Sequence, residues 1–310
     1  NHSLSHSQDS GVTAQTLVQW DGTDGTITLN PTGLGGVDLT QADTQNGLQI
    51  EVILNDLPID LIFTVYSGAG NASQATITLP GGQPSGAGPK YYYLEYASFT
   101  PSVGSGANFQ NVGAVEMLVN GYNDATDLTI HDVRTAAFDW GDLPDTSVGG
   151  SNYPTRFANN GPRHLIGNLT LGTAIDSIEI DGVPSVPATG DDANNATNDE
   201  DGVRQTPGVL WQFSPTGGSI DVVVTGGAAC LAGWIDWNGD GTLTGSGENI
   251  FNGQSLTAGS HTLTFAVPVN PGGGSYYARF RLFAPETGGG CLSNYTPTGR
   301  AINGEVEDYR

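Results

Sequence analysis

Apolar and polar residues alternate in short runs along about the first 135 residues of the chain. A period of two is typical of β-strands with one buried face, and Gly, Pro, Asn and Asp separate the runs. The runs span residues 26–29, 48–54, 61–66, 75–79, 91–96, 114–119 and 127–130. About eight strands over such a length predict a β-sandwich or a jelly roll.

The same pattern returns in the second part of the chain, again without a long helical segment. We expect strands near residues 169–171, 210–213, 220–225, 230–236, 261–267 and 276–283. Residues 136–150 have the composition of a linker that leads into a second domain. The sequence therefore predicts an all-β protein with two jelly-roll-like β-sandwich domains in tandem, residues 19–136 and residues 137–310.

The first 18 residues are predicted to form an N-terminal tail. Residues 1–10 are polar and show no periodicity, whereas residues 12–20 alternate roughly between apolar and polar positions. A segment of this kind can add a strand to the sheet of a neighbouring molecule. We therefore regard residues 1–18 as a candidate donor strand for self-assembly.

The charge balance is strongly acidic, with 32 Asp and Glu against 9 Lys and Arg and a formal net charge of −23. Nucleic acid and anionic membrane surfaces would be repelled by such a chain, whereas cations would be attracted. A role in solubility alone is the alternative. No apolar run reaches the roughly 18 residues of a membrane-spanning helix, so direct membrane insertion is not expected.

The two cysteines, Cys230 and Cys291, are interpreted as a disulfide, since abundant Gly with little charge is typical of extracellular β-proteins. Closing a loop of this length would stabilise the fold by about 4 kcal/mol in the chain-entropy model. Two buried free thiols are the alternative. The chain begins Asn1-His2-Ser3 without Met, which is expected of a processed, secreted protein at the cell surface.

The clearest candidate site is the acidic loop at residues 236–242. Its predicted calcium ligands are the side chains of Asp236, Asn238 and Asp240, the carbonyl of Thr242 and the carboxylate of Glu248. Calcium takes six to eight oxygen ligands, and oxygens at alternate positions with Gly between them can wrap around one ion. Glu248 stands at loop position thirteen rather than twelve, and a strand precedes the loop, so no EF-hand is predicted. A hydrated turn is the alternative.

The other predicted calcium ligands belong to three further acidic clusters: Asp139 with Asp142, Asp191 and Asp192 with Asp199 and Asp201, and Glu305 with Glu307. Adjacent acids repel one another, and a divalent ion would relieve that repulsion. Charge runs are more often solvated faces. The last pair lies on one face of a terminal strand, where a charged edge that prevents aggregation is the alternative.

A series of motifs in the order of the chain resembles the GEVED domain, which recurs in large bacterial exported and surface proteins. The motifs are Asp139–Asp145, Gly161–His164, Leu169–Gly172, Asp181–Pro184, Gly190–Asp192, Asn198–Val203, Gly233–Gly241, Ala278–Leu282 and Gly304–Tyr309. The resemblance covers about residues 139–310. It implies an extracellular β-sandwich module, often in adhesin-like proteins, with no established catalytic role.

No enzymatic activity is predicted. The five histidines lack zinc-type spacing, and the chain contains neither a nucleophile elbow nor a phosphate-binding loop. Paired carboxylates are the chemistry of glycoside hydrolases, but the acids here stand in Gly-rich turns suited to ions. A glycosidase is therefore the least favoured function.

Two functions remain in competition. The first is an extracellular structural or adhesive surface protein, with a calcium-stabilised filament subunit joined by N-terminal strand donation as its specific form. Its partners would be further copies of itself. The alternative is a carbohydrate-binding module, in which Tyr91, Tyr92, Tyr93 and Tyr96 would form a platform for surface glycans.

Overall fold

The computed structural model describes residues 3–23, 25–146, 152–174, 179–190, 200–269, 274–286 and 288–310. Within these ranges the regular structure is β-strand, apart from two single-turn 3-10 helices, η1 (Tyr96–Ser98) and η2 (Phe157–Asn159). The predicted all-β class is confirmed. The chain divides into two compact units, unit 1 (Asn1–Ala137) and unit 2 (Phe138–Arg310). In the described ranges, no helix has the length and hydropathy needed to cross a bilayer.

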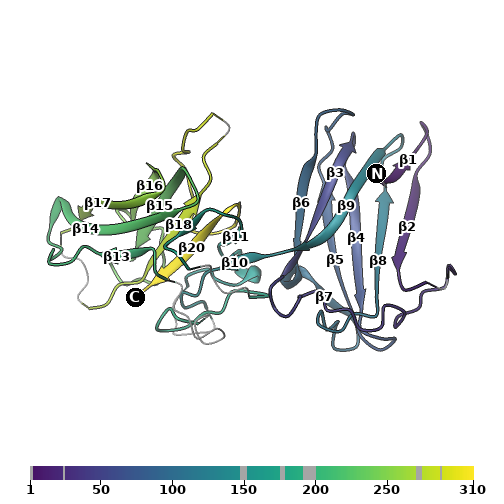
Figure 1. The fold of residues 1–310 in the computed structure, drawn as a ribbon, viewed down its shortest axis with the longest axis horizontal. Helices are drawn as coiled ribbons and strands as arrows, with labels where there is room; N and C mark the ends of the chain where they lie inside the picture. The colour runs from purple at the N-terminus through teal and green to yellow at the C-terminus, as the bar shows by residue number, and fades with distance from the viewer. Residues whose placement is uncertain are drawn as a thin grey trace. The chain divides into compact units, whose positions relative to one another are not determined.

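Unit 1 contains two antiparallel sheets (Figure 1). Its strands are β1 (Leu4–Ser7), β2 (Ala14–Trp20), β3 (Gly47–Asn55), β4 (Ile59–Tyr66), β5 (Ala72–Leu79), β6 (Lys90–Glu95), β7 (Thr100–Val103), β8 (Ala114–Gly121) and β9 (Asp127–Ala136). One sheet has the strand order β1-β9-β3-β6 and the other has the order β2-β8-β4-β5-β7. Strands that are distant in sequence are thus neighbours, as expected of a sandwich.

The core of unit 1 follows from the alternation in its strands. In β4, Ile59, Leu61, Phe63 and Val65 are fully buried, while the residues between them are partly exposed. Successive side chains of a strand point to opposite faces, so one face of β4 packs into the core. Apolar residues of both sheets, including Ile50 of β3, join the same cluster.

The N-terminal segment is a structural part of unit 1. β1 pairs with β9, and β2 pairs with β8 along its whole length. The predicted boundary between residues 18 and 19 falls inside β2, so a separate tail of residues 1–18 is wrong. Backbone hydrogen bonds to β8 and β9 provide the order that the polar composition alone does not predict.

Unit 2 is built from strands of uneven length, from two residues to twelve (Figure 1). They are β10 (Phe138–Trp140), β11 (Arg163–Leu165), β12 (Thr170–Leu171), β13 (Val203–Gln205), β14 (Ser214–Thr225), β15 (Ala229–Ile235), β16 (Asn249–Leu256), β17 (Gly259–Val267), β18 (Ala278–Phe283), β19 (Arg300–Ile302) and β20 (Gly304–Tyr309). One sheet has the order β16-β15-β18-β20, and a second pairs β14 with β12, β13 and β17. A small third sheet has the order β10-β11-β19.

Two predicted strands are absent from the structure. Residues 26–29 form no strand, and the side chain of Ile27 is almost fully exposed. Residues 210–213 lie in the connection before β14, with Leu210 and Phe213 exposed. Both runs are four residues long, and a run this short becomes a strand only where a neighbouring strand pairs with it.

Candidate metal centre

The acidic loop predicted to bind calcium follows directly after β15. Asp236 is buried, and its carboxylate accepts hydrogen bonds from the backbone N–H groups of Gly239 at 2.7 Å and Gly241 at 3.0 Å. Both glycines have left-handed backbones, with φ of +70° and +83°, which other residues adopt only with strain. The sequence therefore folds this loop back around the Asp236 carboxylate.

The alternate positions of the loop hold one another in place. Asn238 accepts a hydrogen bond from the backbone N–H of Asp240 at 2.7 Å. Asp240 in turn accepts from the backbone N–H and the hydroxyl of Thr242, at 2.9 and 2.8 Å. The bonds from Thr242 lower the pKa of Asp240, which stays ionised. The oxygen groups of the loop are thus ordered by local hydrogen bonds.

Glu248 completes the group from the opposite side, immediately before β16. Its side chain is 1 % exposed, and one carboxylate oxygen accepts from the backbone N–H of Gly245 at 2.6 Å. The other oxygen, Oε1, has no hydrogen-bond partner. Burial raises the pKa of Glu248, and the charges of Asp236 and Asp240 raise it further. A buried carboxylate oxygen without a partner is costly unless a cation occupies the adjacent space.

The carboxylates of Asp236, Asp240 and Glu248 converge, and we call these three residues the acidic triad. One oxygen from each lies within 4.8 Å of the oxygens of the other two. An ion with calcium–oxygen distances of about 2.4 Å holds ligands up to about 4.8 Å apart, so the spacing fits one calcium ion. In the described part of the chain, this is the one convergence of three metal-binding side chains found.

Tyr153 is a member of this site that the sequence did not reveal. Its buried hydroxyl donates a hydrogen bond to Asp236 Oδ2 at 2.5 Å. Burial and the charge of Asp236 raise the pKa of Tyr153, so the phenol stays protonated. Because 83 residues separate the two partners, no local motif signals the contact.

The carboxylates of β20 are buried structural groups and not a charged edge. Glu305 accepts from the backbone N–H of Leu171 on β12, and Glu307 accepts from that of Gly202 at 2.8 Å. The hydroxyl of Tyr309 also donates to Glu307, at 2.8 Å. Burial raises the pKa of Glu307 to about 8. The edge interpretation is wrong, because both carboxylates hold neighbouring segments of unit 2 against β20.

The remaining predicted ligands contact backbone amides in the same way. Asp139 accepts from the backbone N–H of Val306 at 2.7 Å, and Asp142 accepts from that of Gly190 at 2.6 Å. Asp201 binds the backbone N–H and the hydroxyl of Thr173. None of these residues joins the acidic triad. Asp191, Asp192 and Asp199 lie outside the described residues.

A buried ion pair accompanies these contacts. Arg279 and Asp308 are both fully buried and form two hydrogen bonds of 2.7 Å. Asp308 also accepts from the backbone N–H groups of Asp142 and Leu143. The sequence placed these residues within motifs but gave no sign of their pairing.

Two other predictions meet different outcomes. The disulfide between Cys230 and Cys291 is confirmed, with 5.6 Å between the Cα atoms. The four predicted tyrosines do not share one surface, because Tyr93 and Tyr96 are buried in unit 1, whereas Tyr91 is exposed and Tyr92 is half-buried. The hydroxyls of the two buried tyrosines are hydrogen-bonded inside the fold, to the side chain of Gln49 and to the carbonyl of Leu39.

Comparison with family models identifies residues 230–310 as a GEVED domain. The C-terminal part of the chain therefore carries this domain, and the predicted resemblance is confirmed over that stretch. The match is shorter than the predicted 139–310, but it includes the acidic triad, Arg279 and the carboxylates of β20. A search of curated proteins found no match to the chain.

Proposed function

We propose that this protein is an exported β-sandwich protein with a structural or adhesive role at the cell surface, stabilised by calcium at the acidic triad. The observation that carries the calcium assignment is the unpartnered Oε1 of Glu248, buried beside Asp236 and Asp240. A bound ion would supply the missing partner and offset the repulsion among three carboxylates.

Asn238 and Thr242 belong to the same loop and would add neutral oxygen ligands. The triad consists of carboxylates alone, two of them buried, and Tyr153 contacts it with a phenol whose pKa is raised. These features support a structural ion, which stabilises the fold by mass action, since only the folded state binds it.

Export is supported by the disulfide in unit 2, because such bonds persist in oxidising compartments. The GEVED domain supports a role at the cell surface, in line with the exported proteins that the resemblance implies. Self-assembly by strand donation would use β1, which pairs with only four residues of the longer β9. The β1 strand of a second copy would make the same contacts.

Thermal unfolding in calcium and in excess chelator tests the calcium assignment. At a calcium concentration 100 times the Kd, a bound ion contributes about 2.7 kcal/mol, which corresponds to a rise in Tm of about 5 to 10 °C. Glu248→Gln should lose most of this rise, because the amide supplies one neutral oxygen in place of the carboxylate.

Glu286→Gln is the matched control, because Glu286 is an exposed acid of unit 2 outside the acidic triad. This variant should keep the full calcium-dependent rise. Equal melting temperatures of the wild type in calcium and in excess chelator would overturn the calcium assignment.

Size-exclusion chromatography of the protein with and without residues 1–10 tests strand donation. We expect larger species only when these residues are present, and a protein that stays monomeric in both cases would contradict strand donation.

A further inference from the structure

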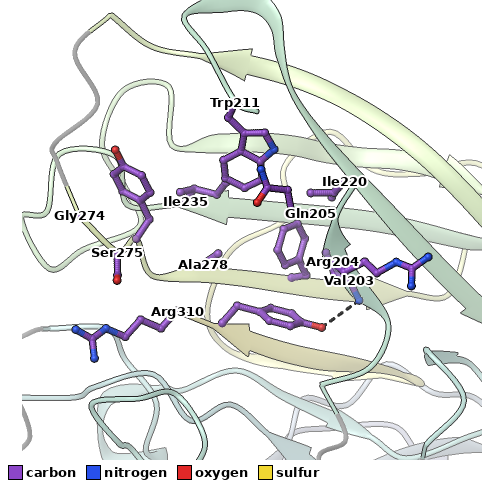
Figure 2. Close-up of a pocket in the computed structure, with 13 residues that line it drawn as sticks. Val203, Arg204, Gln205, Trp211, Ile220, Ile235, Gly274, Ser275, Ala278 and Arg310 are labelled. Atoms are coloured by element: carbon purple, nitrogen blue, oxygen red, sulfur yellow. Dashed lines mark hydrogen bonds between the residues drawn. The ribbon is translucent and has the colours of Figure 1, made fainter. Parts of the chain in front are cut away.

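Unit 2 contains a hollow of about 430 Å³ that the calcium assignment does not use. Arg204 and Gln205 of β13 line it together with Trp211, which precedes β14. Figure 2 shows Trp211 at one end of the hollow, while the side chains of Arg204 and Arg310 extend outward from its rim on opposite sides. The volume lies within the range of about 300–1,000 Å³ that is usual for small-molecule sites.

Hydrogen bonds and ring packing hold the aromatic side chains of this hollow in place. The indole N–H of Trp211 donates to the carbonyl of Ser219 at 2.9 Å, and the ring packs edge-on against Trp237 and Phe265. The hydroxyl of Tyr309 accepts a hydrogen bond from the backbone N–H of Val203 at 3.0 Å. Side chains held in this way lose little conformational entropy when a ligand binds.

The charge of the lining is opposite to that of the chain. The chain has 32 acidic and 9 basic residues, yet the described lining of the hollow contains Arg204 and Arg310 and no Asp or Glu. The side chain of Arg204 is 73 % exposed at the rim, where it forms a weak ion pair of 3.5 Å with Asp221 that the carboxylate of a ligand would replace. A ligand with an anionic group fits this lining better than a cationic one.

We propose that this hollow binds an oligosaccharide that carries a carboxylate sugar. The rings of Trp211, Tyr276 and Tyr309 offer apolar surfaces. The face of a pyranose ring that exposes C–H groups can stack on such a surface. The guanidinium of Arg204 would exchange its exposed ion pair with Asp221 for one with the sugar carboxylate. The amide of Gln205 donates to the carbonyl of Val209, so its oxygen would accept hydrogen bonds from sugar hydroxyl groups. A peptide strand fits less well, because the strand edge beside the hollow, β13, is only three residues long.

This inference rests on the proposed function only in that an adhesive surface protein needs a ligand outside the cell. The acidic triad lines no part of the hollow, but Trp237, adjacent to Asp236, packs edge-on against Trp211 and Tyr276. Failure of sugar binding would leave the calcium-dependent Tm unchanged. Failure of the calcium assignment would leave sugar binding measurable in chelator, so the two outcomes are distinguishable.

Isothermal titration calorimetry of the whole protein with two matched sugar pairs tests the proposal. The first pair is sialyllactose with lactose, and the second is trigalacturonate with maltotriose. Both pairs are measured in chelator, and the first pair is also measured in calcium. We expect at least one acidic sugar to bind about tenfold or more tightly than its neutral partner, with affinity that falls as salt increases. Absence of binding by both acidic sugars would overturn the proposal, and equal binding of acidic and neutral sugars would overturn its charge selectivity.

Variants separate the hollow from the rest of the surface. Arg204→Gln should weaken binding of the acidic sugar about fivefold and leave the Tm unchanged, because this side chain is exposed. Trp211→Ala should weaken it about tenfold or more. Gln205→Ala serves as a second probe if the Trp211 variant folds poorly. Arg300→Gln and Trp20→Ala are matched controls outside the lining, and binding losses in them equal to those of the test variants would contradict the assigned site.

Discussion

The two units of this protein use different interactions to hold a β-structure together. Unit 1 has long, regularly alternating strands around an apolar cluster, and the buried acids among its described residues are Asp21 and Glu95. Unit 2 has two apolar clusters and many buried ionisable groups. Those groups include three arginines and the acids of β20: Arg163, Arg279, Arg281, Glu305, Glu307 and Asp308.

The difference follows from how each unit satisfies its backbone. Paired strands satisfy most of the N–H groups in unit 1, because β3, β4, β8 and β9 each have eight to ten residues. In unit 2 several strands have two or three residues, so long irregular segments are packed inside the fold. Buried carboxylates accept the N–H groups of those segments, which otherwise would be unsatisfied. In this chain, the acids of the motif Gly304–Asp308 thus bind backbone N–H groups of distant segments.

The largest effect is expected from Arg279→Met, which removes the buried partner of Asp308. An unpaired buried carboxylate should reduce the free energy of unfolding of unit 2 by about 5 kcal/mol. Hydrogen–deuterium exchange resolved by peptide measures this in unit 2 and should show no change in unit 1. Arg300→Met is the control, since Arg300 is exposed on β19. An equal loss in both variants would contradict the role of the buried pair.

A somewhat smaller effect is expected from Leu61→Ala, which leaves a cavity in the core of unit 1. Leu61 is fully buried in β4, and the truncation should cost about 3 kcal/mol of the unfolding free energy of unit 1. The partly exposed Leu57 provides the control Leu57→Ala, which should cost well below 1 kcal/mol. The same exchange experiment reports both. If protection in unit 2 fell as much as in unit 1, the two units would not be independent in stability.

The smallest effect concerns the pH dependence of unit 2. The folded-state pKa of Glu307 is raised to about 8 from an ordinary 4.5, so the folded state binds a proton that the unfolded state releases. The stabilising contribution of the protonated group is fully present below about pH 4.5 and is lost as the pH rises through about 8. From pH 5.5 to pH 7 we expect a loss of about 2 kcal/mol in unit 2.

Glu307→Gln should remove this part of the pH dependence, because its amide oxygen still accepts from Gly202 and no longer titrates. Denaturant unfolding at both pH values, followed by tryptophan fluorescence, measures the difference, since four of the five tryptophans lie in unit 2. An unchanged pH dependence in the variant would show that Glu307 titrates normally.

The sequence by itself determined the all-β class, the disulfide and the form of the acidic loop. The strands and the loop depend on residues close in the chain, and for the disulfide two cysteines in an extracellular type of β-protein allow a single pairing. The alternation in β4 places one face in the core, two cysteines allow one pairing, and Asp236, Asn238 and Asp240 order their own turns. A run of only four alternating residues, such as 26–29, does not determine by itself whether a strand forms.

Only the tertiary structure decided which carboxylates converge and which bind backbone. Asp142 and Glu307 resemble Asp240 in sequence, since each stands in a short acidic motif that also contains Gly. Their roles depend on N–H groups 48 and 105 residues away, just as Tyr153 reaches Asp236 across 83 residues. Burial and the identity of a distant partner set the behaviour of a carboxylate, and neither is encoded in the local pattern of the chain.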